Sequence, residues 1–261
     1  MPFTVSHIAA VLPFSRLLAR WRLLSATIVG SMVPDFGLLL PTRPPRVETH
    51  SAIGLLTFCL PVGLTTFWIF QLLVKPAVTQ ILPNGAYMRW QRSAAPAATA
   101  NLKQWLLAAC GVLIGAVTHL IWDGFTHEGA RGVRMIPALD DPAVDFAGHH
   151  IIGARLLQDM CSLVGLGIVL ILVAYGLRPG RPGDTPPVRG LRAGERHAWI
   201  VAYVLMTAII AGLFLVIRRP PSPVQSVALW VGTYAIAALR GCAAALVVVS
   251  LALTLRLRAN R

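Results

Sequence analysis

The amino-acid sequence predicts an all-α protein, a polytopic integral membrane helical bundle with about six transmembrane helices. Hydrophobic residues make up 56% of its 261 positions and charged residues only 13%, whereas about a quarter of the residues in a soluble domain are charged. The apolar residues also gather in long runs that short basic loops separate. The lipid bilayer is therefore the expected partner. The net charge of +13 is typical of loops at a membrane surface and does not indicate nucleic acid.

Five stretches are apolar enough over about 20 residues to span the hydrocarbon core of a bilayer. They cover residues 51–74, 105–122, 156–177, 198–217 and part of 224–255. The last stretch is too long for one straight crossing and holds Arg240, so we expect a tilted or broken helix there.

Two further stretches near the N-terminus are weaker. The run from Leu24 to Leu40 is long enough for a sixth span, but Pro34 and Asp35 interrupt it near its end. Residues 8–19 are shorter and contain a proline. They predict a partial span or a helix that lies in the membrane interface.

Loop charges predict the orientation, because short cytoplasmic loops carry an excess of Lys and Arg. Segment 75–103 holds four basic residues and no acidic one. Segment 178–197 holds five basic and two acidic residues, and three arginines follow Leu255. The predicted spans place these three segments on the same side of the membrane, which is therefore expected to be the cytoplasm. The segment 123–155, with five acidic residues, then lies outside. We predict a protein of the cytoplasmic (inner) membrane whose candidate site faces outward.

We expect a single transmembrane domain over residues 1–261. Residues 1–175 form the half that carries the candidate site. The segment 178–197 is rich in Pro, Gly and Arg and lacks apolar periodicity, which indicates a flexible cytoplasmic linker. Residues 198–261 supply the C-terminal helices.

The candidate site centres on His119, Asp123 and His127. Their spacing of four and four places two imidazoles and a carboxylate along one stripe of a helix. Such a donor set suits Zn²⁺ or another divalent transition metal, and an aspartate can bridge two ions. Thr126 lies on the same stripe and is expected behind the ligands. Gly124 is a point at which the regular helix could end before His127.

Other candidates lie on the same predicted side. Asp35 follows a proline at a helix end and His50 opens the next span, so both can converge on the stripe. His7 joins them if the first short helix starts outside. The full set of predicted metal ligands is His7, Asp35, His50, His119, Asp123, His127, His149 and His150.

His149 and His150 are adjacent, so on a helix they point about 100° apart and at most one coordinates. Gln158 and Asp159 open the span that follows, and we expect them in a supporting polar network or as further ligands. The plain alternative is that all these groups only satisfy one another. Ionisable residues within spans are costly and usually functional, which favours the metal.

Four motifs resemble a bacterial membrane-protein family of unknown function, the domain of unknown function 4184 family. They are PFTVSH, SATIVGSMVPDF, HSAIGLLTFCLPVGL and THLIWDGFTHEG. The resemblance covers about residues 1–175, and it implies no activity.

The order of the candidate ligands is also similar to that in the zinc-dependent phospholipase C and single-strand nuclease superfamily and in related membrane-bound metal-dependent hydrolases. That resemblance implies one zinc held by Asp35, His50, His119 and a bridging Asp123. A second would use His127 with His149 or His150. The chain departs from the pattern after His150, since no carboxylate follows four residues later.

These observations lead to a predicted metal-dependent hydrolase of phosphate esters, among which a phospholipid or lipid-linked phosphate suits the membrane location. Asp35 or Asp123 is expected to orient the attacking water. Three alternatives stay open. A metal-ion carrier or other transporter needs polar residues that continue towards the cytoplasm. Haem ligation by paired histidines predicts a coloured protein. A scaffold with a structural metal predicts no hydrolysis.

Overall fold

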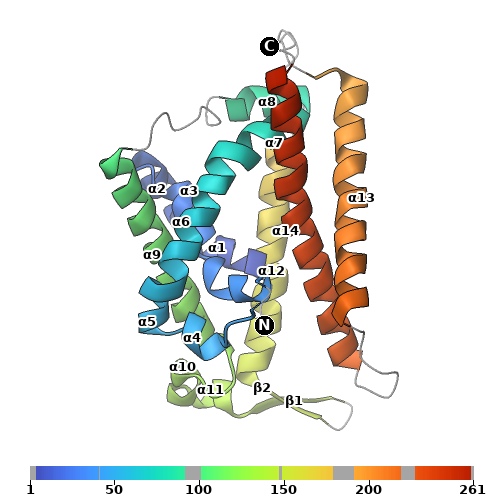
Figure 1. The fold of residues 1–261 in the computed structure, drawn as a ribbon. Helices are drawn as coiled ribbons and strands as arrows, with labels where there is room; N and C mark the ends of the chain where they lie inside the picture. Colours follow the sequence, from blue (N-terminus) through green and yellow to red (C-terminus); the bar gives the residue numbers. More distant parts are fainter. Residues whose placement is uncertain are drawn as a thin grey trace. The chain divides into compact units, whose positions relative to one another are not determined.

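The computed structural model describes residues 4–40, 42–91, 101–146, 149–178, 191–218 and 227–259. The protein is all-α apart from one small hairpin (Figure 1). Within the described residues, five helices are long and apolar enough to cross a membrane. They cover Ala52–Ile81, Leu102–Thr126, Gly153–Gly176, Ala193–Ile217 and Leu229–Ala259. The chain is therefore a polytopic membrane protein, and these five spans fall on the five stretches that the apolar runs predict.

The first span is a continuous series of helical segments with two π-helical turns. It runs through α5 (Ala52–Gly54), η4 (Leu55–Cys59), α6 (Leu60–Ile69), η5 (Phe70–Val74) and α7 (Lys75–Ile81). Pro61 and Pro76 each follow a π turn closely. Because proline has no N–H for the helical ladder, a locally widened turn accommodates it without ending the helix. The Ser51 hydroxyl caps the start by accepting a hydrogen bond from the Gly54 N–H at 2.8 Å.

The predicted sixth span is not a continuous helix. Helix α3 (Leu24–Gly30) has only seven residues, about 10 Å of rise against a core of about 30 Å. The chain then turns into the 3₁₀ helix η3 (Val33–Leu38), which has Pro34 at its start. Residues 4–20 are likewise broken. They form η1 (Thr4–His7), α1 (Ile8–Val11), η2 (Leu12–Phe14) and α2 (Ser15–Arg20).

The described chain divides into two compact units, Met1–Phe67 with Ala100–Tyr175, and Trp68–Thr99 with Gly176–Arg261. The first unit contains the N-terminal segments together with two long helices and the chain between them. These further elements are α4 (Arg46–Thr49), α9 (Leu102–Thr126), α10 (Arg131–Met135), α11 (Pro137–Asp140), β1 (Pro142–Phe146), β2 (His149–Ile152) and α12 (Gly153–Gly176).

Helices α3 and α9 are in backbone contact through glycines. A Cβ on Gly115 would lie 2.1 Å from the carbonyl oxygen of Thr27, and one on Gly30 would lie 2.2 Å from that of Val112. Only residues without side chains allow helices to approach so closely. This contact holds the end of α3, with Ser31, against the middle of α9.

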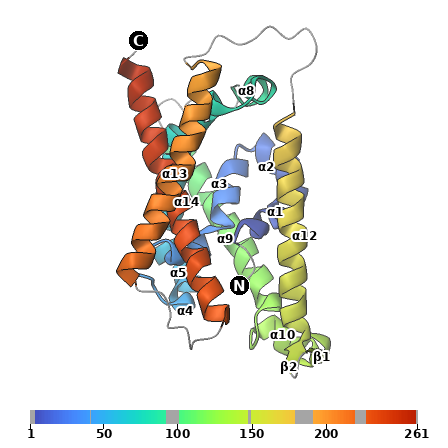
Figure 2. The same ribbon diagram turned by 90° about the vertical axis from the view of Figure 1, so that its right-hand side faces the viewer.

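Strands β1 and β2 form an antiparallel hairpin in which Asp145 faces His150 and Phe146 faces His149. The expectation that His149 and His150 lie on a helix is wrong, since both lie in β2. The reason is local: residues 142–146 and 149–152 pair with each other before α12 begins at Gly153. Strand β2 leads directly into α12 (Figure 2).

The second unit contains η5 and α7 with α8 (Asn84–Gln91), α13 (Ala193–Arg218) and α14 (Val227–Ala259). Helices α13 and α14 pair closely along their length (Figures 1 and 2). Helix α14 is unbroken over 33 residues, so of the two predicted alternatives, a tilted or a broken helix, the break does not occur. The Arg240 guanidinium lies 4.5 Å above the ring of Phe214, a cation–π contact that accommodates a charge inside the span. Most of the predicted linker lies outside the described residues.

Candidate metal centre

Six histidine and aspartate side chains from separate parts of the first unit converge near one end of α9. They are His7 at the end of η1, Asp35 in η3, His50 after α4, His119 and Asp123 on α9, and His127 directly after α9. We call this set the His/Asp cluster.

The two members on α9 share a buried face because four residues separate them. Only 1% of His119 is exposed, and its Nε2 lies 3.3 Å from Oδ2 of Asp123. Helix α9 continues through Gly124 to Thr126, so the glycine does not end it. His127 follows with extended backbone, and its Nδ1 lies 3.4 Å from Oδ1 of Asp123.

Asp35 of η3 and His50, which follows α4, approach His119 of α9. Oδ1 of Asp35 lies 3.4 Å from Nε2 of His50 and 3.8 Å from Nε2 of His119. The other oxygen of Asp35 accepts a hydrogen bond from the Thr4 hydroxyl at 2.9 Å. Nε2 of His50 is also 3.4 Å from Oδ2 of Asp123. Both imidazoles therefore lie between the two carboxylates.

Hydrogen bonds on the far side of each ring determine which nitrogen faces the cluster. Nδ1 of His119 lies 2.7 Å from the Ser31 carbonyl oxygen, which can only accept, so Nδ1 carries the proton. Nδ1 of His50 lies 2.8 Å from the Thr49 hydroxyl, whose own proton goes to the Arg46 carbonyl. When the rings are neutral, both present an unprotonated Nε2 to the cluster, the form that binds metals.

His7 is stacked on His119, with ring centroids 3.7 Å apart and planes inclined by 14°. Its Nε2 lies 3.6 Å from Oδ1 of Asp123. Burial, together with the neighbouring His119, lowers the pKa of His7 to about 4 despite the nearby carboxylates. The ring is therefore neutral at physiological pH and can act as a ligand.

Several polar atoms of the cluster are buried without a hydrogen bond among the described residues. They are Nδ1 and Nε2 of His7, Oδ1 of Asp35, Nε2 of His50, Nε2 of His119, Oδ1 of Asp123 and Nε2 of His127. Native structures contain few such atoms, and each one costs about 1–3 kcal/mol. Seven such atoms lie in this cluster, and those with a free lone pair are groups that could coordinate a cation.

The spacing of these atoms fits a divalent metal. The atoms form two compact groups, His7, His119 and Asp123, and Asp35, His50 and His119. Ligand atoms about 2.0–2.1 Å from a tetrahedral zinc lie about 3.3–3.4 Å from one another. The distances between histidine nitrogens and aspartate oxygens of the cluster run from 3.3 to 3.8 Å. Because one nitrogen binds one ion, the two groups compete for His119.

Arg46 is a further residue in contact with the cluster, and the sequence alone did not point to it. Its guanidinium pairs with Oδ2 of Asp123, while 40% of its side chain stays exposed. In the sequence it is one of two arginines in a proline-rich loop, with no periodicity to mark it. It reaches the cluster because α4 packs against η3, the segment that carries Asp35. The supporting contacts from Thr4, Ser31 and Thr49 also had no signal in the sequence.

The remaining predicted site residues are not members of the His/Asp cluster, or their side chains lie outside the described residues. Thr126 is buried, and its hydroxyl lies 3.4 Å from Nδ1 of His127. Gln158 is buried on α12. Asp159, by contrast, is 56% exposed and forms an ion pair with Arg155 at 3.1 Å, so it has no place in the buried cluster. The side chains of His149 and His150 lie outside the described residues, and their role stays a prediction.

The fold and this cluster define a class: a polytopic helical membrane protein with a buried histidine and aspartate centre at one end of its second span. The chain belongs to a family described as a domain of unknown function (DUF4184), whose model matches residues 1–251. This confirms the resemblance seen in the four motifs, and the match extends beyond the first 175 residues. No curated protein and no solved structure matches the chain.

Proposed function

We propose that this protein is a membrane-bound, metal-dependent hydrolase of phosphate esters. The observation that carries the proposal is the set of seven buried, unbonded nitrogen and oxygen atoms on six converging side chains. Neutral imidazoles and carboxylates are the ligands that zinc and similar divalent ions prefer in proteins.

The ion would be held by the unprotonated nitrogens of His50 and His119 and by the carboxylates of Asp35 and Asp123. When bound, zinc lowers the pKa of a water molecule to about 7, which supplies a hydroxide nucleophile at neutral pH, and it stabilises charge on phosphoryl oxygens. His7 and His127 approach the second oxygen of Asp123, so this carboxylate can bridge towards a second ion.

Asp35 is the better candidate to orient the attacking water. Its Oδ2 is held by the Thr4 hydroxyl, and its Oδ1 faces the cluster without a hydrogen bond. Asp123 is more fully engaged, because Arg46 pairs with one of its oxygens and two histidines approach the other. Each carboxylate oxygen has two lone pairs, so Oδ1 of Asp35 could hold the ion with one and accept a hydrogen bond from the attacking water with the other.

Arg46 supplies the positive charge that a phosphate ester requires. Its guanidinium reaches the cluster, and its exposed part is open to an incoming ligand. Arginine binds phosphate oxygens in a bidentate geometry. We therefore assign Arg46 to binding the phosphate group of the substrate.

We place the site at the extracytoplasmic face of a bacterial cytoplasmic membrane. This rests on loop charges, since the segment before α9 carries four basic residues and no acidic ones over positions 75–103. His119 and Asp123 lie near the other end of α9, which puts the cluster at the depth of lipid headgroups on the opposite side.

A metal-ion carrier is the second candidate, and the packing of α3 on α9 argues against it. Next to the cluster, Gly30 and Gly115 bring the two helices into backbone contact. The hydroxyls of Thr27 and Ser31 at this contact donate to carbonyls of their own helix. This interface therefore offers an ion no polar route from His119 towards the other end of α9.

A phosphodiesterase assay tests the proposal. The full chain, reconstituted in vesicles and loaded with zinc, is expected to hydrolyse bis(p-nitrophenyl) phosphate, and a chelator should abolish the activity. Asp35→Asn should lose it, whereas Asp159→Asn, a change at an exposed carboxylate of the same unit, should retain it. Zinc-loaded protein that hydrolyses no phosphoester would leave only a structural metal or a carrier.

A further inference from the structure

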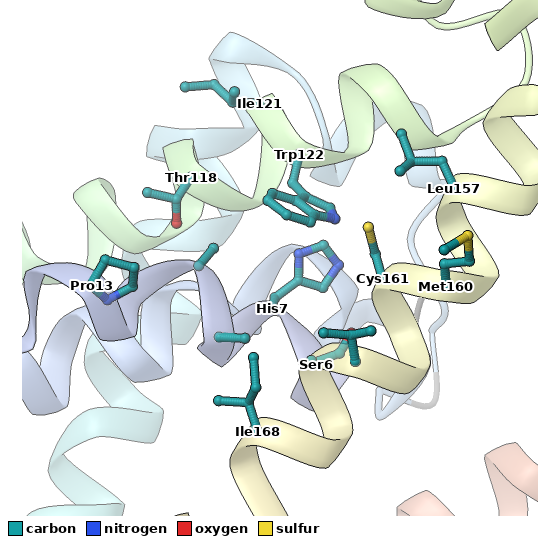
Figure 3. Close-up of a pocket in the computed structure, with 14 residues that line it drawn as sticks. Ser6, His7, Pro13, Thr118, Ile121, Trp122, Leu157, Met160, Cys161 and Ile168 are labelled. Atoms are coloured by element: carbon teal, nitrogen blue, oxygen red, sulfur yellow. The ribbon is translucent and has the colours of Figure 1, made fainter.

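An apolar cavity of about 550 Å³ adjoins the His/Asp cluster in the first unit. Residues of η1, α1 and η2 form one wall, and residues of α9 and α12 form the others. Figure 3 shows the imidazole of His7 among the lining residues, with Trp122 on one side and Cys161 on another. The volume is within the range of ligand sites, about 300–1,000 Å³.

The cavity runs along the membrane-spanning helices. On α12 its lining extends from Leu157 to Ile168, which are 11 residues apart. At 1.5 Å per residue this is about 16 Å, or roughly half of the hydrocarbon core. The wall is made almost entirely of apolar side chains such as Pro13 and Met160. A long apolar space in this direction matches the shape and orientation of a lipid chain.

His7 belongs to both the cavity and the cluster. It lines the cavity, stacks on His119 and lies 3.6 Å from Asp123. Only 3% of His7 is exposed, and neither ring nitrogen has a hydrogen bond to any residue that the structure describes. A single molecule can therefore place a polar group at the cluster and an apolar group in the cavity. Arg46 provides the charge that complements an anionic headgroup on the cluster side.

We propose that this cavity holds one hydrocarbon chain of a membrane lipid whose phosphate group binds at the His/Asp cluster. The proposal rests on the proposed function and specifies its substrate class, an amphiphilic phosphate ester. Water in the cavity would gain few hydrogen bonds from its walls, whereas a lipid chain would exchange one apolar environment for another. The phosphate at the cluster distinguishes the bound lipid from its neighbours.

Photo-cross-linking of the full chain tests the proposal. Zinc-loaded protein is reconstituted in phosphatidylethanolamine and phosphatidylglycerol vesicles that contain phosphatidic acid with a diazirine in one acyl chain. After illumination, peptide mass spectrometry locates the label. A diacylglycerol with the same diazirine chain is the control without phosphate. We expect phosphatidic acid to label peptides of η1–η2 and α12 that line the cavity, and diacylglycerol to label them much less.

Two variants of α12 form a matched pair. Cys161→Phe fills the cavity, whereas Leu163→Phe adds an aromatic ring at a position that is 73% exposed and outside the lining. We expect the label in the cavity to be lost in Cys161→Phe and retained in Leu163→Phe. If Cys161→Phe does not fold, Cys161→Leu provides a smaller filling and should give a partial loss.

Even labelling of all lipid-facing helices by both probes, unchanged in Cys161→Phe, would overturn the chain site. If phosphate release still occurred in that case, the proposed hydrolysis would stand. Specific labelling of the cavity without zinc-dependent release of phosphate would support the site for the lipid chain and reject the hydrolase. The two failures are therefore distinguishable.

Discussion

Nδ1 of His119 lies 2.7 Å from the carbonyl oxygen of Ser31, a residue 88 positions earlier in the chain. This contact fixes the ring so that Nε2 faces the carboxylates of Asp35 and Asp123. It exists because glycines allow α3 to lie directly on α9. Packing of the two helices and the chemistry of the cluster are thus coupled.

Gly115→Val tests this coupling. A Cβ at this position would lie 2.1 Å from the Thr27 carbonyl oxygen and 2.5 Å from the Ser31 nitrogen. We expect the substitution to push α3 away, lower the free energy of unfolding by about 1–3 kcal/mol and weaken zinc binding. Thermal unfolding and zinc titration measure both effects. Gly167→Val, where an added Cβ meets nothing within 4 Å, is the control. Equal effects of the two variants would refute the coupling.

Thr4→Val tests the support of Asp35. The substitution removes the hydroxyl that donates to Oδ2 at 2.9 Å. Loss of a partner behind a metal ligand typically costs about 10–100-fold in affinity or activity, and we expect about a tenfold loss of zinc affinity. In Thr65→Val, the lost hydroxyl only bonds the Pro61 carbonyl of its own helix, and zinc affinity should not change. If Thr4→Val binds zinc like the wild type, Asp35 does not need this support.

Arg46→Gln separates metal binding from catalysis. Arg46 competes with an ion for Oδ2 of Asp123, so its removal should keep or raise zinc affinity. Hydrolysis should nevertheless fall, because the phosphate loses its charged partner. Arg131→Gln, at an exposed position of the same unit, should change neither property. Loss of bound zinc in Arg46→Gln would show that Arg46 supports the site in another way.

Zinc affinity should depend on pH through His50. Burial alone lowers the pKa of His50, but the carboxylates of Asp123 and Asp35 outweigh burial and leave the pKa raised. Without metal, the ring therefore keeps its proton to a higher pH than an ordinary histidine. Because zinc must displace this proton, affinity should fall as pH decreases from about 8 to about 6. His7 stays neutral over this range, since its pKa is about 4.

Competition with a chelating dye at several pH values measures this dependence. His50→Ala should bind more weakly and with a flatter pH profile. His197→Ala, at an exposed histidine of the second unit, should reproduce the wild-type profile. A zinc affinity that does not change between pH 6 and 8 would contradict the assigned role of His50.

The five spans could be predicted because length and apolar composition alone decide whether a helix crosses a bilayer. The stripe from His119 to Asp123 could be predicted for a similar reason, since spacing of four determines the face of any regular helix. Both are local properties. The actual end of α9 at Thr126, beyond Gly124, depends on packing and was not predictable from the residue type.

The surroundings of the stripe depend on contacts between distant segments. Leu24 to Leu40 is apolar enough for a span, yet α3 ends at Gly30, and the following 3₁₀ helix carries Asp35 to His50. Arg46 and Ser31 reach the cluster only through this path of the chain. No periodicity or spacing in the sequence records such contacts. The hairpin of β1 and β2 was missed because segments of five and four residues carry little strand signal.

Metal analysis of the purified protein tests the central claim most directly. Zinc content is measured by mass spectrometry in the wild type, His119→Ala, Asp123→Ala and the exposed control Asp159→Ala. We predict about one or more equivalents of zinc in the wild type and in Asp159→Ala, and a large loss in the other two variants. Equal metal content in all four proteins would contradict the assignment of the His/Asp cluster as a metal centre.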